Sequence, residues 1–215
     1  MFRVDSAALA EGMSDSEMLE SVLSGIKSKK RRKEVVKRLL DRFGSYGDVV
    51  CAHVDRLREV EGVDDRSISA LKAVEKSAKL LARATLFSRK KMDSLYTVME
   101  YCNTVMAHED REQFRALFLD NQNGLIADEV LSVGTVDQTP VYPREVLRRA
   151  LELGASGLIL AHNHPSGDPT PSMADICRTN ELVAAAKLFG IGVHDHLIVG
   201  CHGNASLRGL GFIGQ

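Results

Sequence analysis

The stretch HNHPSGDPTPSMAD, residues 162–175, gathers the residue types from which proteins build metal sites. His162 and His164 are one residue apart, and alternate residues of a β-strand project to the same side. Neutral imidazole is a common zinc ligand, so this pair would supply half of a tetrahedral shell. Asp175 offers a carboxylate as a third ligand. Three protein ligands leave the fourth position to water, which is typical of a catalytic zinc site.

The same residues also describe an ordinary strand, loop and capped helix. Ser172 is a natural N-cap, and Ser-x-x-Asp approximates the capping box found at many helix starts. Pro165, Pro169 and Pro171 would end the strand and stiffen the loop, which lowers the entropy lost when side chains are held in place. This alternative explains Ser172 and Asp175 but leaves both histidines to coincidence, so we favour the metal site.

The elements that must position these residues follow from hydrophobic periodicity in the second half of the chain. We expect strands over residues 113–119, 125–133, 157–161, 192–199 and 205–207. We expect helices over residues 95–106, 142–153 and 172–188. Strands mixed with helices in this order indicate an α+β or α/β sandwich around one sheet.

The first half of the chain predicts helices only. They are expected over residues 14–23, 33–43 and 48–57 and from residue 67 onwards, with a boundary at residues 88–91. Residues 1–92 carry 20 Lys and Arg against 14 Asp and Glu, a net +6, whereas residues 93–215 carry 8 against 15, a net −7. A basic half can attract nucleic acid, and it can equally be a solvated helical surface.

Composition excludes several classes of protein. The longest apolar runs are far too short to span a bilayer, and the N-terminal residues lack a basic-then-apolar signal pattern. The four cysteines are dispersed, which favours free thiols in a reducing compartment. We therefore expect a cytoplasmic protein with no membrane partner.

The string His-x-His, seven residues, then Ser-x-x-Asp resembles the signature of JAMM (MPN-type) metalloproteases. With VYPREVLRRAL upstream and HDHLIVG downstream, the chain resembles the bacterial RadC family over residues 93–215. The likeness is looser before that, through SDSEMLESVL and LREVEGV. It implies an α+β protein: a helical domain over residues 1–88 that carries a degraded helix-hairpin-helix, then an α/β/α, cytidine-deaminase-like mixed-sheet zinc domain over residues 93–215.

The resemblance also implies roles for single residues. Zinc would be held by His162, His164 and Asp175, and an upstream glutamate would take a proton from the bound water. Glu129 is the expected glutamate, with Glu145 as its rival at a predicted helix start. Ser172 would hydrogen-bond the developing oxyanion or only cap the helix, and the sequence leaves both roles open. Of the remaining histidines, His194 and His196 are expected to belong to a structural strand, with a place at the border of the pocket as the alternative. His108 and His202 are expected at the surface or in loops.

The segment LREVEGVD, residues 57–64, resembles a helix-hairpin-helix, in which backbone N–H groups approach a DNA phosphate. Asp64 stands where that motif has its second glycine, and Asp65 follows it. Two carboxylates oppose phosphate binding. A basic tract over residues 27–38 could contact phosphates in a salt-dependent way. Few aromatic residues that could stack on bases lie near it.

Two functions therefore compete. The first is a zinc-dependent peptidase or isopeptidase that acts on the amide carbonyl of a protein or peptide substrate. The second is a non-catalytic, DNA-associated accessory protein whose metal site is structural or vestigial. Both histidines, Asp175, Ser172 and a glutamate favour the first, and the charge asymmetry supports the second.

Overall fold

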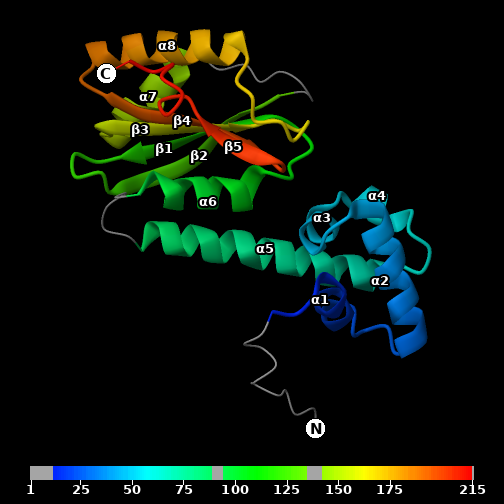
Figure 1. Ribbon diagram of the computed structural model, residues 1–215. Helices are drawn as coiled ribbons and strands as arrows, with labels where there is room; N and C mark the ends of the chain where they lie inside the picture. Colours follow the sequence, from blue (N-terminus) through cyan, green and yellow to red (C-terminus); the bar gives the residue numbers. More distant parts are fainter. Residues whose placement is uncertain (1–11, 89–93, 135–141, 215) are drawn as a thin grey trace. The chain divides into compact units, whose positions relative to one another are not determined.

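The structure is a computed structural model of the 215-residue chain, which describes residues 12–88, 94–134 and 142–214 (Figure 1). The chain forms two compact units, Met1–Ala78 and Lys79–Gln215. The division falls inside one long helix, whereas the sequence placed its boundary at residues 88–91, most of which lie outside the described residues. The fold class is as expected, with a helical N-terminal part followed by a mixed five-stranded sheet.

The first unit is a small bundle of helices around an aliphatic core. Its elements are α1 (Asp15–Val22), α2 (Lys29–Phe43), α3 (Tyr46–Cys51), α4 (Val54–Arg58) and the first half of α5 (Asp65–Phe87). Ser14 caps α1 through a capping box with Glu17, at the start of the helix expected over residues 14–23. The single helix predicted over residues 48–57 was wrong. The chain leaves helical geometry at Ala52, and His53 starts α4 by accepting a hydrogen bond from the Asp55 N–H.

A short hairpin joins α4 to α5. Gly62 takes a φ of 92°, which a glycine adopts without strain. The carboxylate of Asp64 accepts hydrogen bonds from the backbone N–H (2.8 Å) and the hydroxyl (2.6 Å) of Ser67. These bonds lower the pKa of Asp64. The departure from the helix-hairpin-helix pattern therefore has a structural role, because Asp64 occupies the N-terminal position of α5 that would otherwise face an anion.

The second unit is built around a sheet with the strand order β2-β1-β3-β4-β5. The strands are β1 (Gln113–Leu119), β2 (Leu125–Val133), β3 (Gly157–Asn163), β4 (Gly192–Gly200) and β5 (Gly203–Ser206). Only the β3–β4 pair is parallel, and the other neighbouring pairs are antiparallel. Strands β1 and β2 and helix α6 (Leu95–Met106) match their predicted bounds, whereas β3 continues two residues further, through His162.

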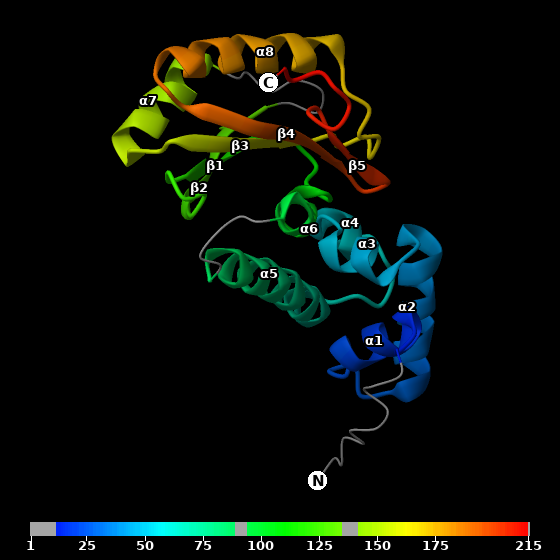
Figure 2. The ribbon, with the colours of Figure 1, turned by 60° about the vertical axis from the view of Figure 1, so that its left-hand side comes forward.

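Helices cover both faces of this sheet, as Figures 1 and 2 show. Helices α7 (Pro143–Leu153) and α8 (Met173–Leu188) pack on one face, and α6 packs on the other. Alternate residues of β1 divide between the two cores: Phe114 and Phe118 face α7 and α8, whereas Leu117 faces α6. The unit is thus the expected three-layer α/β/α domain. Among the described residues, no helix combines the length and apolar composition needed to cross a membrane.

A buried ion pair lies between the sheet and α6. Arg115 on β1 bonds both carboxylate oxygens of Asp128 on β2 at 2.6 Å, and the Tyr101 hydroxyl of α6 also bonds Asp128. The Asp128 side chain is only 2% exposed, so its charge depends on these two partners.

We expect Asp128→Ala to lower the free energy of unfolding by about 3–5 kcal/mol, because the guanidinium of Arg115 is then left buried without its counter-charge. Urea unfolding followed by circular dichroism measures this loss. Arg148→Ala is the matched control, since it breaks pairs on the exposed side of α7 and should cost at most about 1 kcal/mol. Equal effects of the two substitutions would contradict a stabilising role for the buried pair.

Candidate metal centre

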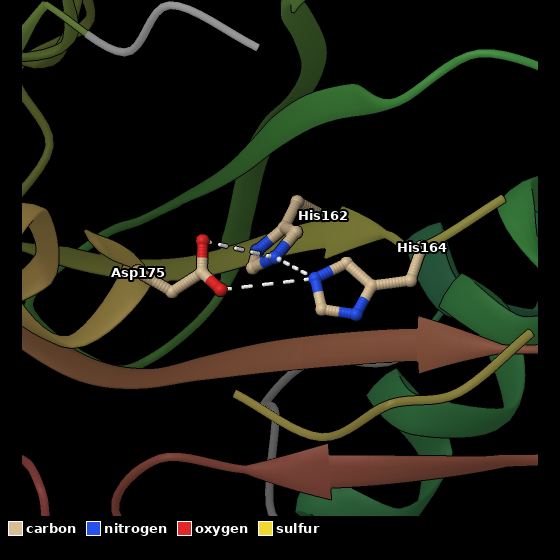
Figure 3. A group of neighbouring side chains, drawn as sticks. All are labelled: His162, His164 and Asp175. Carbon is tan, nitrogen blue, oxygen red and sulfur yellow. Dashed lines mark hydrogen bonds and ion pairs between the residues drawn. The ribbon is translucent and has the colours of Figure 1, made fainter. Parts of the chain in front are cut away.

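The two histidines of the motif stand at the carboxyl end of β3. His162 is the penultimate residue of that strand, and it lies buried opposite Phe114 of β1 and Ile198 of β4. His164 lies one residue beyond the strand, but its N–H still donates to the carbonyl of Val199 at 2.8 Å. This bond extends the strand pairing by one step, so both rings project to the same side, as Figure 3 shows.

Asp175 comes from the first turn of α8, where the predicted capping box forms. The Ser172 hydroxyl accepts from the Asp175 N–H (3.1 Å), while the Ser172 N–H (2.8 Å) and hydroxyl (2.6 Å) donate to Oδ2 of Asp175. The other carboxylate oxygen, Oδ1, lies toward the His162 ring (Figure 3). The cap and the metal site are therefore not alternatives, because one carboxylate takes part in both.

The separations of the ligand atoms fit a zinc ion. The Nε2 atoms of His162 and His164 are 3.0 Å apart. Asp175 Oδ1 is 3.5 Å from Nε2 of His162, and Oδ2 is 3.7 Å from Nε2 of His164. Ligands at zinc bond lengths of about 2.0–2.1 Å and tetrahedral angles lie about 3.3 Å apart. The three side chains thus have the donor set and the spacing for zinc.

Each histidine uses its other ring nitrogen elsewhere. Nδ1 of His164 lies 2.7 Å from the carbonyl oxygen of Asp168, and a carbonyl can only accept, so this nitrogen carries the proton. Nδ1 of His162 lies 2.8 Å from Nε2 of His196. Such contacts from the outer nitrogen are typical of metal-ligating histidines, because they set the orientation of the ring.

The charges of the site follow from its burial. Complete burial lowers the pKa of His162 to about 4, so this ring is neutral near pH 7. The neighbouring carboxylate of Asp175 raises the pKa of His164, and the charge of Glu112 adds to that effect. Burial opposes the charge of Asp175, but bonds to His164 and Ser172 hold its pKa well below the ordinary value. The site therefore combines a neutral ring, a carboxylate and a ring that favours positive charge.

A pocket opens beside two of the three candidate ligands, His162 and Asp175. Apolar side chains of β1, β3 and α8 form part of its wall, and Glu112 and Arg178 add a carboxylate and a guanidinium. The lining residues are Glu112, Phe114, Leu160, His162, Asp175, Arg178, Thr179, Leu182 and His196. Sequence reasoning missed Glu112, which immediately precedes β1 and lies two residues from the strand partner of His162.

Glu129 and Glu145, the two glutamates considered from the sequence, lie on β2 and α7. Glu129 on β2 is bonded by Nε and Nη2 of Arg149, at 2.6–3.1 Å, and these bonds lower its pKa. Glu145 lies in the first turn of α7, bonded to Arg148 at 3.0 Å. Neither glutamate is among the described residues that line the pocket. The catalytic role expected of Glu129 stays a prediction, and its only bonded partner described is an arginine outside the pocket.

The second His-x-His pair is divided by an irregularity in β4. Register with β3 shifts between Leu158 and Ile159, so that His194 has no partner in the strand pairing. His194 is exposed, whereas His196 is buried against His162 and lines the pocket. His196 thus borders the candidate site, as the alternative expectation for this pair had it, whereas His194 is not among the described residues that line the pocket. The sequence shows that His196 lies in an apolar strand, but it does not show which strand lies beside it.

Backbone contacts hold the loop that follows His164. Gly167 has a φ of 85°, and its carbonyl accepts from the N–H of His202 at 3.1 Å. Gly200 passes so close that an added Cβ would lie 2.2 Å from the carbonyl oxygen of Gly167. The turn between β4 and β5 therefore fastens the loop through contacts that only glycines permit.

Comparisons with known proteins agree with this geometry. A family model described as a RadC-like JAB domain matches residues 92–212, which include the sheet and the three candidate ligands. A UPF0758 protein from Rhodobacter capsulatus is 50% identical over 204 residues, which cover 95% of each chain. The chain therefore belongs to the RadC family.

Proposed function

We propose that the protein is a zinc-dependent peptidase or isopeptidase. The observation that carries this proposal is the convergence of two Nε2 atoms and a carboxylate within bonding distance of one cation. The Nδ1 atoms of both histidines are engaged outside the site, so in the neutral rings that a metal requires the Nε2 atoms face it with their lone pairs. Such a set of acceptors calls for a positive charge between them.

His162, His164 and Asp175 would hold the metal. When bound, zinc would polarise a substrate carbonyl and lower the pKa of a water molecule to about 7. Three protein ligands with an adjoining pocket match an open, catalytic site better than a closed, structural one. The apolar part of the pocket would accept the side chain next to the scissile amide.

Glu112 is better suited than Glu129 to the proton transfer. It lines the pocket with His162 and Asp175, and its charge acts on His164. A general base must reach the water and must be basic enough to accept its proton. Glu129 does not line that pocket, and the two nitrogens of Arg149 that bind its carboxylate lower its pKa. Glu112 would accept a proton from the attacking water and return it to the departing amine.

Ser172 would support the ligand Asp175. Its hydroxyl proton is directed at Oδ2 of that residue, so in this arrangement the proton is not directed at a substrate oxyanion. The oxyanion role expected from the family resemblance stays a prediction, which requires that the hydroxyl turn away from Asp175.

The DNA-associated alternative has support in one surface. Seven basic side chains of α2 are exposed: Lys29, Lys30, Arg31, Lys33, Lys37, Arg38 and Arg42. Arg38 is paired with Glu61, and Asp64 occupies the nearby start of α5, which reduces the charge available to a phosphate. This surface makes DNA a second candidate partner. DNA binding at α2 would not use the metal site.

We expect about one zinc ion per wild-type chain, and its loss in His164→Ala and Asp175→Ala, because each variant lacks one of three ligands. Elemental analysis of the purified proteins measures this. His194→Ala is the matched control and should keep its zinc, since His194 lies outside the ligand group. Wild type that takes up no zinc even after reconstitution would exclude the catalytic proposal and turn attention to the basic face of α2.

We expect Glu112→Gln to retain zinc and to hydrolyse peptides about 10²–10⁴-fold more slowly than wild type, because the proton acceptor is lost. Glu129→Gln breaks only the ion pair with Arg149 and should slow hydrolysis far less. Mass spectrometry of a peptide library incubated with each zinc-loaded protein gives the rates. A larger loss of hydrolysis in Glu129→Gln than in Glu112→Gln would identify Glu129 as the proton acceptor. A wild type that cleaves no peptide or isopeptide bond would refute the peptidase proposal.

We expect Ser172→Ala to lower the free energy of unfolding by about 0.5–2 kcal/mol and also to weaken zinc binding, because Asp175 loses its cap partner. Unfolding in urea and competition with a chromophoric chelator measure the two effects. Ser14→Ala removes the equivalent capping box of α1 and should leave zinc binding unchanged. Slower hydrolysis at unchanged zinc affinity would instead assign Ser172 to the oxyanion.

A further inference from the structure

Behind the candidate ligand His162 lies a chain of hydrogen bonds that leads back to α8. His196 contacts His162 through Nε2 (2.8 Å) and Thr179 through Nδ1 (2.6 Å). The Thr179 hydroxyl lies 2.6 Å from the backbone carbonyl oxygen of Asp175. His162, His196 and Thr179 are all buried, so water does not compete for these bonds.

The directions of these bonds follow from the last acceptor. A carbonyl oxygen has no proton, so the Thr179 hydroxyl must donate its single proton to Asp175. The same hydroxyl then accepts from Nδ1–H of His196. In a neutral ring the second nitrogen has no proton, so Nε2 of His196 accepts from Nδ1–H of His162. Nε2 of His162 is left with its lone pair directed at Asp175 and His164.

Burial supports the neutral state that this argument requires. His196 is buried, and a charged ring there would have no counter-charge among its bonded partners His162 and Thr179. Phe114 packs edge-on against His196, with ring centroids 5.7 Å apart, and restricts its rotation. The ring therefore has one orientation and one tautomer that satisfy all its contacts.

We propose that His196 and Thr179 are positioning residues that keep the proton of His162 on Nδ1 and its Nε2 free to bind a metal. The proposal rests on the proposed function for its purpose, but the proton positions that it assigns do not require a metal. Because the chain of bonds ends on the backbone of Asp175, one ligand sets the tautomer of another.

The tautomers of the metal-free chain test this directly. Long-range ¹H–¹⁵N correlation spectra of the full chain, labelled at its histidines, distinguish a proton on Nδ1 from one on Nε2. We expect His162 and His196 to carry theirs on Nδ1 in wild type. Thr179→Val keeps the shape of the side chain but removes the acceptor, so His196 and then His162 should lose this single tautomer. Thr179→Ser returns the hydroxyl and should restore it.

Zinc affinity gives a second readout. Disturbing a hydrogen bond behind a metal ligand costs about 10–100-fold in affinity, which we expect for Thr179→Val and for His196→Phe. His196→Gln can still accept from His162 through its side-chain oxygen, so it should retain more affinity than His196→Phe. Thr104→Val is the matched control, because Thr104 makes the same bond to a carbonyl four residues earlier, at 2.9 Å, without a histidine partner.

The outcomes separate this proposal from the function itself. A proton on Nε2 of His162 in the metal-free wild type would overturn it, as would Thr179→Val behaving like Thr104→Val in both measurements. Zinc bound normally in that case would leave the proposed function intact. A wild type with the expected tautomers but no affinity for zinc would support the positioning pair and refute the metal-dependent function.

Discussion

The first turn of α8 holds the candidate site together, because every polar group of Asp175 is used there. Its N–H and one carboxylate oxygen close the cap with Ser172, and its other carboxylate oxygen lies toward His162. Its backbone carbonyl accepts from Thr179. A helix start is a place where the chain must satisfy free N–H groups in any case. Here the residue that satisfies them also faces the metal position, so local helix stability and site geometry depend on the same bonds.

The parallel pairing of β3 with β4 supplies the other half of the site. It places His162 and His196 on the face of the sheet that α8 covers, so their rings meet in a dry layer. Burial keeps both rings neutral. A neutral ring is what the candidate ligand His162 needs in order to bind a metal. Glu112 reaches the same place from the start of β1, at the edge of that layer. The candidate site therefore lies where one helix start, two parallel strands and an adjoining strand converge.

The sequence was sufficient for what is local and insufficient for what depends on pairing between strands. His162, His164 and Asp175 lie in one short string whose strand, loop and helix periods are visible, and the structure brings them together as expected. Glu112 and His196 arrive from other strands, and only the register of the sheet reveals them. Glu129 was expected from the family resemblance, and the sequence contains no sign of its bond to Arg149.

The fastened loop explains why the motif has its length. Between His164 and Ser172 the chain must leave β3, contact the β4–β5 turn at Gly167 and enter the cap of α8. Seven residues cover this path, and proline or a glycine contact restricts several of them. An inserted residue would have to break one of the contacts that hold the loop, and a deleted residue would move a candidate ligand away from the other two. The seven-residue spacing in the motif therefore reflects the distance that the chain must cover between the end of β3 and the start of α8.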